Sequence, residues 1–357
     1  MAETSPKSLV IIGGGIVGLC IAVVAQTRGH FVTIVARDKP EDTASGVAAG
    51  MIAPALEAMH DAAPADSCRR LSHASSLWYG PKSIWPRSVS LPMASLTSQP
   101  TVYAWSVGKG EESLAELHKT GAHVEPLSST DLRYWSLGVE WDGVYVKGDW
   151  QLPSLWLMDH LRQHFLAQGG RYVVGDVHGL ERQRIRLRQG GWITADHVVV
   201  AAGYGGHALR RQVPALSVLT PIKGHVLDMP KQDWIGVVRS SLGYVASDST
   251  GARAGATMEP GRDDLVVDPE IVAGLKARIN TMLPGLDLGS AVPRTGIRAA
   301  TPDGWPLIGL DPTSGVYVAT GMRRNGYVFA PLAAQIIADL VEGTSNADAE
   351  IYRPDRF

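Results

Sequence analysis

A glycine-rich turn near the N-terminus constrains the fold of this chain more than any other feature. The turn occupies 13–18 and reads GGGIVG, and it follows a short apolar run at 8–12 that is rich in β-branched residues. Apolar residues at helical spacing then cover 16–28, and a second apolar run follows at 31–35. Buried parallel strands and packed helices have these patterns. The sequence therefore predicts a strand–helix–strand unit of about 30 residues.

This turn suits the pyrophosphate of a dinucleotide. Glycines let the backbone approach phosphate oxygens closely, and the N–H groups at the start of the helix favour negative charge. Gly13 is predicted to form the tight turn, Gly15 to admit the phosphates and Gly18 to let the helix pack on the strand. The type of dinucleotide stays open at this point. Asp38 lies where a ribose-binding acid is expected, whereas the adjacent Arg37 would suit a 2′-phosphate.

Composition limits the kinds of protein that the 357 residues can form. The length favours two domains, or one domain with a second lobe. The formal net charge of -2 argues against broad binding of nucleic acid or of an anionic membrane. Cys20 and Cys68 are too few for a disulfide framework or a cysteine-based zinc site, and we expect no metal. The N-terminus lacks a signal-peptide pattern, and glycines interrupt the longest apolar stretch, 9–25, so we expect a cytoplasmic protein without a membrane span.

Two kinds of pattern occur in the rest of the chain. Further Rossmann-type elements are predicted at 152–168, 170–174, 197–201 and 316–319, and at 331–342 as a closing helix with proline at its start. Strands of an antiparallel sheet are predicted at 216–227 and 237–246. Residues 60–150 show no sustained period and are expected to be irregular, and 322–326 is a charged loop.

These patterns predict an α/β plus β fold, in which a mainly antiparallel substrate lobe is inserted into a discontinuous Rossmann-type domain. The cofactor domain is predicted at 1–60, 140–208 and 290–357. The substrate lobe is predicted at 61–139 and 209–289.

Several segments, in the right order along the chain, resemble the superfamily of FAD-dependent D-amino-acid oxidases and glycine oxidases. They are ARDKPEDT at 36–43, VAAG at 47–50, PIKGH at 221–225, GATME at 255–259, GIR at 296–298, DGWPLIG at 303–309 and TGMRRNG at 320–326. The resemblance implies FAD as the cofactor. A covalent link is not expected, because no cysteine lies near the C-terminal motif. The cofactor contacts that the resemblance implies are Gly13, Gly15, Ile16, Val17, Gly18, Arg37, Asp38, Thr43, Ser45, Ala49, Gly50, Met51, Val177, Gly203, Arg298, Arg324, Asn325, Gly326, Tyr327 and Val328.

The same resemblance implies a substrate site. Arg298 matches an arginine that pairs with the substrate carboxylate, and a guanidinium fits a carboxylate through two parallel hydrogen bonds. Tyr244 matches a tyrosine near that carboxylate, although the residues after it depart from the family's proline–arginine continuation. Arg324 and Met322 are also placed at the substrate, with methionine where glycine oxidases often have histidine.

Two further cations suggest a hypothesis about the substrate. Arg323 and Lys223 would make the site more basic than one carboxylate demands. A substrate with a second acidic group, such as iminodiacetate, would use that charge. The alternative is that both cations are solvated or bind the phosphates of FAD.

The implied activity is oxidation of a small amino acid or N-substituted glycine, such as glycine, sarcosine, a D-amino acid or iminodiacetate. A hydride leaves the substrate Cα–H for flavin N5, the imine hydrolyses, and O2 reoxidises the flavin to give hydrogen peroxide. Two alternatives stay open: a dehydrogenase that passes electrons to a quinone or carrier, and a tRNA-modification oxidase domain. The second needs a basic docking surface, which a net charge of -2 does not indicate. A homo-oligomer is compatible with either activity.

Overall fold

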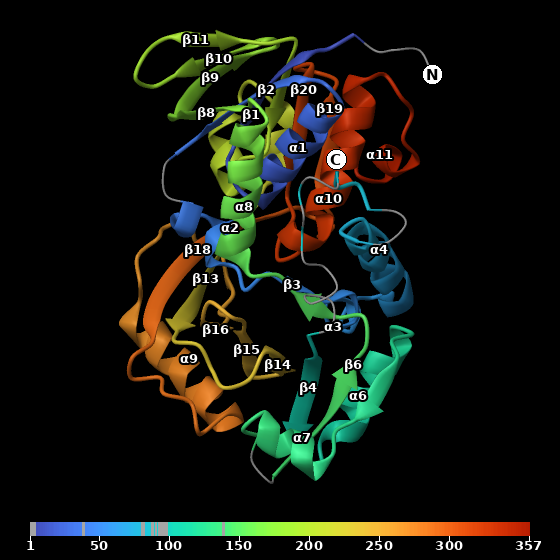
Figure 1. The fold of residues 1–357 in the computed structure, drawn as a ribbon, viewed down its shortest axis with the longest axis vertical. Coiled ribbons are helices and arrows are strands. Elements are labelled where there is room, and N and C mark those ends of the chain that lie inside the picture. Colours follow the sequence, from blue (N-terminus) through green and yellow to red (C-terminus); the bar gives the residue numbers. More distant parts are fainter. Residues whose placement is uncertain are drawn as a thin grey trace.

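The computed structural model describes residues 5–37, 40–79, 83–86, 89, 91, 99–137 and 140–357. Figure 1 shows an elongated molecule with a sheet toward each end. Among the described residues, the upper sheet has six strands in the order β19-β20-β12-β1-β2-β8. The lower sheet has nine strands, again counted over the described residues. This is the predicted combination of a Rossmann-type domain and a sheet domain, which the structure confirms.

The glycine-rich turn lies between the central strand of the upper sheet and the first helix, as predicted. β1 (Ser8–Ile12) is followed by α1 (Ile16–Thr27) and β2 (Phe31–Ala36). β1 pairs in parallel with β2 on one side and with β12 (His197–Val200) on the other. Its side chains alternate between two cores, as a strand covered on both faces requires.

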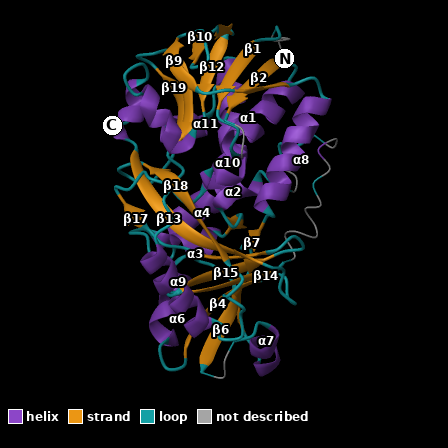
Figure 2. Ribbon diagram, turned by 90° about the vertical axis from the view of Figure 1, so that its left-hand side faces the viewer, coloured by secondary structure: helices purple, strands orange, loops and turns teal. Residues whose placement is uncertain are grey.

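Helices cover one face of this sheet and a small sheet covers the other (Figure 2). The helices are α1, α8 (Ser154–Ala167) and α10 (Gly326–Val341). The small sheet comprises β9 (Val177–Glu181), β10 (Arg184–Leu187) and β11 (Trp192–Thr194). The other elements of this lobe are η1 (Pro40–Asp42), α2 (Ala44–Val47), β8 (Arg171–Val174), η4 (Gly203–Leu209), β19 (Leu307–Asp311), β20 (Val316–Thr320) and α11 (Ala347–Ile351).

The closing helix begins earlier than predicted, so that Pro331 lies inside α10 rather than at its start. A proline at this position cannot donate the hydrogen bond that the carbonyl of Tyr327, four residues earlier, would otherwise accept. The indole N–H of Trp78 donates to that carbonyl at 2.8 Å instead. A contact from a distant segment therefore satisfies the carbonyl, and the sequence of the helix alone does not show it.

The nine-stranded sheet is mainly antiparallel. Its path is β17 (Glu259–Pro260), β13 (Thr220–Met229), β16 (Ala252–Gly255), β15 (Gly243–Ser247), β14 (Gly236–Ser240), β4 (Thr101–Ser106), β6 (Trp141–Val146) and β5 (Val124–Pro126), with β18 (Val292–Ala300) also paired to β13. The prediction of one strand at 237–246 is wrong in one respect, because this range forms two strands, β14 and β15, that pair as a hairpin. The strand predicted from 216 begins later, since η5 (Pro214–Val218) occupies its first residues.

The prediction that 60–150 is irregular is wrong for most of the residues described there. The elements in and near this range are β3 (Met51–Ile52), α3 (Pro54–Ala58), α4 (Pro64–Ser76), α6 (Gly110–Lys119), α7 (Ser129–Tyr134) and β7 (Trp150–Gln151), besides β4, β5 and β6. Most of these elements are too short to show a periodic pattern, but α4 has 13 residues, and its buried positions 67, 71, 74 and 75 follow a helical spacing that the prediction missed. Ser128 and Asp131 are a further sequence signal of a helix in this range, because they form a capping box at the start of α7.

The predicted domain bounds stay a prediction, and sheet membership departs from them in two places. β6 and β18 lie in the nine-stranded sheet, although 140–208 and 290–357 were assigned to the cofactor domain. α4, from the range assigned to the other lobe, packs against α10 in the core of the upper lobe. None of the helices in the described ranges has the length and apolar character that a membrane crossing requires.

Candidate active site

Two glycines of the N-terminal turn lie against backbone atoms that leave no room for a side chain. Gly13 has a φ of 120° and donates through its N–H to Val35 O at 2.9 Å. A Cβ on Gly13 would lie 2.4 Å from Ala201 O, and one on Gly18 would lie 2.0 Å from Gly13 O. The turn and the first helix therefore approach each other as closely as a dinucleotide-binding turn requires.

The segment after β2 lies against the start of α1. The Ser45 hydroxyl accepts a hydrogen bond from the Ile16 N–H at 3.1 Å, and the Thr43 hydroxyl caps α2 by accepting from the Gly46 N–H at 3.0 Å. Further along, Gly50 has a φ of 70° and passes under Leu152, whose carbonyl would lie 1.9 Å from a Cβ. This close packing holds 43–51 beside the turn predicted to bind the pyrophosphate.

Asn325 indicates a ligand at the start of α10. Its Oδ1 atom is buried and, within the described residues, has no hydrogen-bond partner. Buried polar atoms are rarely left without a partner, so this acceptor fits a donor group of a bound cofactor. Tyr327, two residues later, donates from its hydroxyl to Ser45 O at 3.0 Å and links α10 to 43–51, which we call the cofactor segment.

The other residues assigned to the cofactor lie on elements of the upper lobe. Arg37 follows β2, Val177 begins β9, and Gly203 begins η4, where its carbonyl accepts from the Thr320 hydroxyl at 3.1 Å. Gly326 begins α10, and Val328 is fully buried in it. Asp38 lies outside the described residues. The roles of all these residues stay predictions.

A cavity of about 650 Å³ lies between the cofactor segment and one face of the nine-stranded sheet. The register of the sheet explains which residues line it. Arg239 lies opposite Tyr244, and Tyr244 opposite Gly255, so all three are on one face. On the neighbouring strands that face carries Gly224 and Arg298, which also line the cavity.

Arg298 is the substrate residue predicted from the sequence, and the structure places it in this cavity. Its Nη1 donates to Thr257 O at 3.3 Å, and no described carboxylate forms an ion pair with it. Burial lowers the pKa of Arg298 from its usual range, while Tyr244 and Glu57 oppose that shift. An arginine keeps its charge under such conditions. The guanidinium is therefore a partly buried cation whose remaining donors face the cavity.

Tyr244 lies on the same face, beside Arg298. Burial raises the pKa of its hydroxyl, although the nearby arginines oppose this, so the hydroxyl stays protonated at neutral pH. A Cβ on Gly255 would lie 2.8 Å from the Tyr244 hydroxyl oxygen, so a glycine opposite the ring leaves room for it. The structure thus brings Tyr244 and Arg298 to one cavity, as the resemblance implied.

Glu57 belongs to the site, although it was not among the residues predicted from the sequence. Glu57 lines the cavity, accepts from Arg239 Nη1 at 2.8 Å and forms a short ion pair with Arg324. Burial would raise the pKa of Glu57, but the two guanidinium groups outweigh it and lower the pKa. Glu57 therefore stays ionised and joins the sheet, through Arg239, to the segment before α10, through Arg324. Its signal in the sequence is one charge in an otherwise apolar segment, 54–58.

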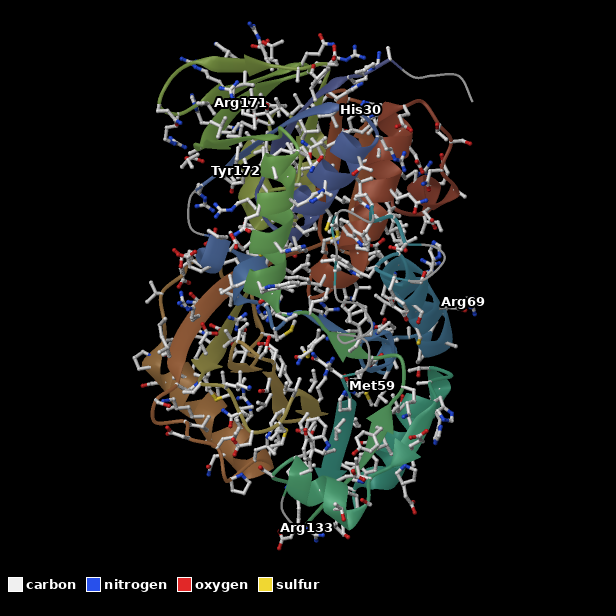
Figure 3. All side chains as sticks on the ribbon, viewed as in Figure 1. His30, Met59, Arg69, Arg133, Arg171 and Tyr172 are labelled. Atoms are coloured by element: carbon white, nitrogen blue, oxygen red, sulfur yellow. The ribbon has the colours of Figure 1, made fainter. Side chains whose placement is uncertain are left out.

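A long-range cap holds the short helix that carries Glu57. Asp149 accepts from the N–H groups of Ala55 and Leu56, both at 3.1 Å, at the N-terminus of α3. Burial raises the pKa of Asp149 to about 7, and these two hydrogen bonds oppose the rise. α3 ends next to Met59, which Figure 3 labels near the middle of the molecule, above the lower sheet.

Three of the residues expected near the substrate do not line the cavity. Lys223 is on the opposite face of β13 from Gly224, and it pairs with Asp264 at 2.5 Å away from the cavity. Arg323 and Met322 do not line the cavity, and Met322 is buried in the upper core. Arg324 does line it and pairs with Glu57, which Arg239 shares, so these three groups keep one net positive charge. The placement of Lys223 in the substrate site was wrong because neighbouring residues of a strand face opposite ways.

Comparisons with known proteins identify the family and the fold. The model of the family described as DAO, FAD-dependent oxidoreductase, matches residues 8–340. A glycine oxidase of Geobacillus kaustophilus is 25% identical over 375 residues, which cover 96% of this chain and 95% of the relative. A bifunctional ThiO/ThiG protein of Nostoc sp. is 28% identical over 376 residues, which cover 94% of this chain but 52% of the relative. This chain thus spans about half the length of that bifunctional relative.

Solved structures show the same fold. The crystal structure of the glycine oxidase from Geobacillus kaustophilus has a TM-score of 0.81 at 23% identity, with 99% of each chain covered. That of an iminodiacetate oxidase from Chelativorans sp. BNC1 has a TM-score of 0.79 at 20% identity, with 97% of this chain and 98% of the other covered. Since the family match spans nearly the whole chain, this protein belongs to the DAO family of FAD-dependent oxidoreductases and uses FAD.

Proposed function

We propose that this protein oxidises a small amine that carries a carboxylate, such as glycine, sarcosine, a D-amino acid or iminodiacetate, with O2 as the final acceptor and hydrogen peroxide as a product. The observation that carries the proposal is Arg298. It is a partly buried guanidinium without a carboxylate partner among the described residues, and it faces a cavity that residues of 43–51 also line. A substrate carboxylate would supply the missing partner.

The residues of the cavity would bind and orient the substrate. Arg298 would hold the carboxylate, and the protonated Tyr244 hydroxyl would donate to it. FAD supplies the two-electron oxidation of the C–N bond. Glu57 is held by two arginines, with a lowered pKa, so it would orient Arg239 and Arg324 rather than take a proton. The amine would enter the reaction in its neutral form, and water would hydrolyse the imine product.

A panel of amines tests this function. Purified protein loaded with FAD should consume oxygen and form peroxide with at least one of glycine, sarcosine, D-alanine and iminodiacetate. Reduction of a dye without peroxide formation would instead support a dehydrogenase. If no carboxylate-bearing amine reduces the flavin under anaerobic conditions, the proposal fails.

The same panel tests the hypothesis that the substrate has a second acidic group. Arg278, rather than Lys223 or Arg323, is the cation that supports this hypothesis. Ile271, Gly274 and Arg278 form one face of α9 (Pro269–Met282), and all three line the cavity. Arg278 Nε donates to Leu242 O at 3.3 Å, and no described carboxylate pairs with it. If Arg278 binds a second carboxylate, Arg278→Met should weaken use of iminodiacetate by about tenfold and leave sarcosine unchanged. Equal or better turnover of the monocarboxylates by the unchanged protein would end the dicarboxylate hypothesis.

Gly224→Ala should raise the KM for the carboxylate substrate by about tenfold, because it displaces a charged hydrogen-bond donor. A Cβ on Gly224 would lie 2.3 Å from Arg298 Nη1 and 2.8 Å from Nη2, so the guanidinium would have to move. FAD content should stay the same. Gly285→Ala is the control, since its Cβ would meet nothing within 4 Å. A wild-type KM in the Gly224 variant would mean that the position of Arg298 does not matter for substrate binding.

A further inference from the structure

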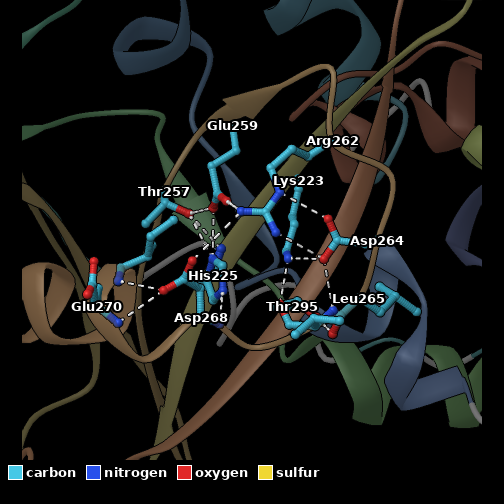
Figure 4. Close-up of polar contacts among 12 residues, drawn as sticks. Lys223, His225, Thr257, Glu259, Arg262, Asp264, Leu265, Asp268, Glu270 and Thr295 are labelled. Carbon is cyan, nitrogen blue, oxygen red and sulfur yellow. Dashed lines mark hydrogen bonds and ion pairs between the residues drawn. The ribbon is translucent and has the colours of Figure 1, made fainter.

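His225 lies on the reverse side of the strand that forms the cavity floor. It belongs to β13, next to Gly224, and its side chain is fully buried on the opposite face of the sheet. Figure 4 shows it at the centre of a polar cluster with Thr257, Glu259 and Asp268. The reaction does not use this side chain directly, so its polar partners need another explanation.

The hydrogen bonds of the ring determine its tautomer. The backbone N–H of Asp268 donates to Nε2 of His225 at 3.0 Å. A backbone N–H can only donate, so Nε2 carries no hydrogen in this arrangement. The hydrogen of the neutral ring is therefore on Nδ1, which donates to Glu259 Oε1 at 2.8 Å.

One branch of this cluster leads to the substrate arginine. The hydroxyl of Thr257 accepts from the backbone N–H of His225 at 2.8 Å and donates to Glu259 Oε1 at 2.7 Å. The carbonyl of the same threonine accepts from Arg298 Nη1 at 3.3 Å. His225 and Glu259 therefore fix the one described protein group to which the Arg298 guanidinium donates.

The other branch leads to α9. Asp268 caps that helix, accepting from the N–H groups of Glu270 at 3.0 Å and Ile271 at 3.4 Å. The next turns of α9 present Ile271, Gly274 and Arg278 to the cavity. Through Nε2, His225 thus also holds the start of the helix that forms a second wall of the cavity.

Two cations and three carboxylates surround the imidazole. Arg262 donates to Glu259 at 3.0 Å and to Asp264 at 3.0 Å, and Lys223 donates to Asp264 at 2.5 Å. The carboxylate of Asp268 lies 3.9 Å from Arg262, so the tautomer of His225 is inferred from the Asp268 N–H that donates to Nε2 and not from a charge balance. Thr257 and Glu259 of this cluster also line the cavity, whereas His225 does not.

We propose that His225, as the Nδ1–H tautomer, is a positioning residue that sets the orientation of Arg298 for substrate binding through Glu259 and the Thr257 carbonyl. The proposal rests on the proposed function, in which Arg298 binds the substrate carboxylate. It predicts an effect on carboxylate binding and not on FAD binding.

Two substitutions separate the branches. In His225→Asn the side-chain amide can still donate to Glu259, but it loses the acceptor for Asp268. In His225→Gln the amide oxygen can still accept from Asp268, but the donor to Glu259 is lost. We expect His225→Gln to raise the KM by about tenfold with kcat within about threefold, and His225→Asn to raise it less. Glu259→Gln, which removes the anion that receives the Nδ1–H, should raise the KM in the same direction.

Acetate binding gives a second measurement that needs no turnover. Acetate carries only the carboxylate, and its dissociation constant can be followed by the change in flavin absorbance of the FAD-loaded protein. The dissociation constant of acetate should rise in His225→Gln by the same factor as the KM. If acetate binding responds in this way while no amine is oxidised, the positioning role stands and the proposed function fails.

His30 is the matched control. It is also buried, and Figure 3 labels it near the N-terminal end of the upper lobe, far from the cavity. His30→Gln and His30→Asn should lower thermal stability without changing the KM or the acetate affinity. The proposal is overturned if His225→Gln binds acetate and substrate like the unchanged protein. It is also overturned if the His30 variants show the same rise in KM, since the effect would then be a general loss of stability.

Discussion

Arg298→Met should raise the KM for a carboxylate-bearing amine by roughly 30-fold to several-thousand-fold. Removing one partner of a buried charge pair costs about 2–5 kcal/mol, and each 1.4 kcal/mol is about tenfold in affinity. The expected effect is this large because Arg298 has no described carboxylate partner of its own, so a substrate carboxylate would be its counter-ion. Steady-state kinetics with the best amine of the panel would measure it.

The same variant should keep its FAD and its fold. Methionine fills the space of the arginine stem, and loss of an unpaired, partly buried cation should not lower the free energy of unfolding. Arg298→Lys should recover only part of the affinity, because an ammonium lacks the two parallel donors of a guanidinium. An unchanged KM in Arg298→Met would remove this residue from the site and with it the main support for the proposed substrate class.

Gly18→Ala should lower the fraction of protein that retains FAD by about tenfold or more. A Cβ at this position would lie 2.0 Å from the Gly13 carbonyl oxygen and 3.1 Å from its carbon, and both are backbone atoms that cannot rotate away. Overpacking of this kind costs about 1–3 kcal/mol, and here the strain falls on the turn predicted to hold the pyrophosphate. The ratio of flavin to protein absorbance after gel filtration measures the loss.

Ala22→Gly is the control for the stability of α1. It lies in the interior of the same helix and should destabilise it by about 1 kcal/mol without touching the turn. Its FAD content should therefore match that of the unchanged protein. After acid precipitation the flavin of both should appear in the supernatant, as expected for a cofactor without a covalent link. Full retention of FAD by Gly18→Ala would contradict the predicted role of the turn.

The features that could be predicted from the sequence are those that depend on neighbouring residues. The spacing of Gly13 and Gly18 between a strand and a helix indicated the βαβ unit, and the structure confirms it. The ordered motifs of 296–326 indicated the FAD-dependent family, and the family match confirms it. The prediction failed in 60–150, where most elements are short and the helical spacing of α4 was missed, and in 237–246, where one apolar stretch contains two strands.

The sequence by itself thus determined the cofactor fold, because the spacing of glycines is a property of neighbouring residues. Through its family resemblance it also led to the prediction that Arg298 binds the substrate. Only the tertiary structure decided what surrounds Arg298. Lys223 and Gly224 are neighbours in sequence, yet strand geometry puts them on opposite faces, and the glycine rather than the cation meets the arginine. Glu57 meets Arg239, 182 residues away, because a cap from Asp149 holds α3 against the sheet. Such contacts depend on strand register and packing between lobes, which no local pattern of residues specifies.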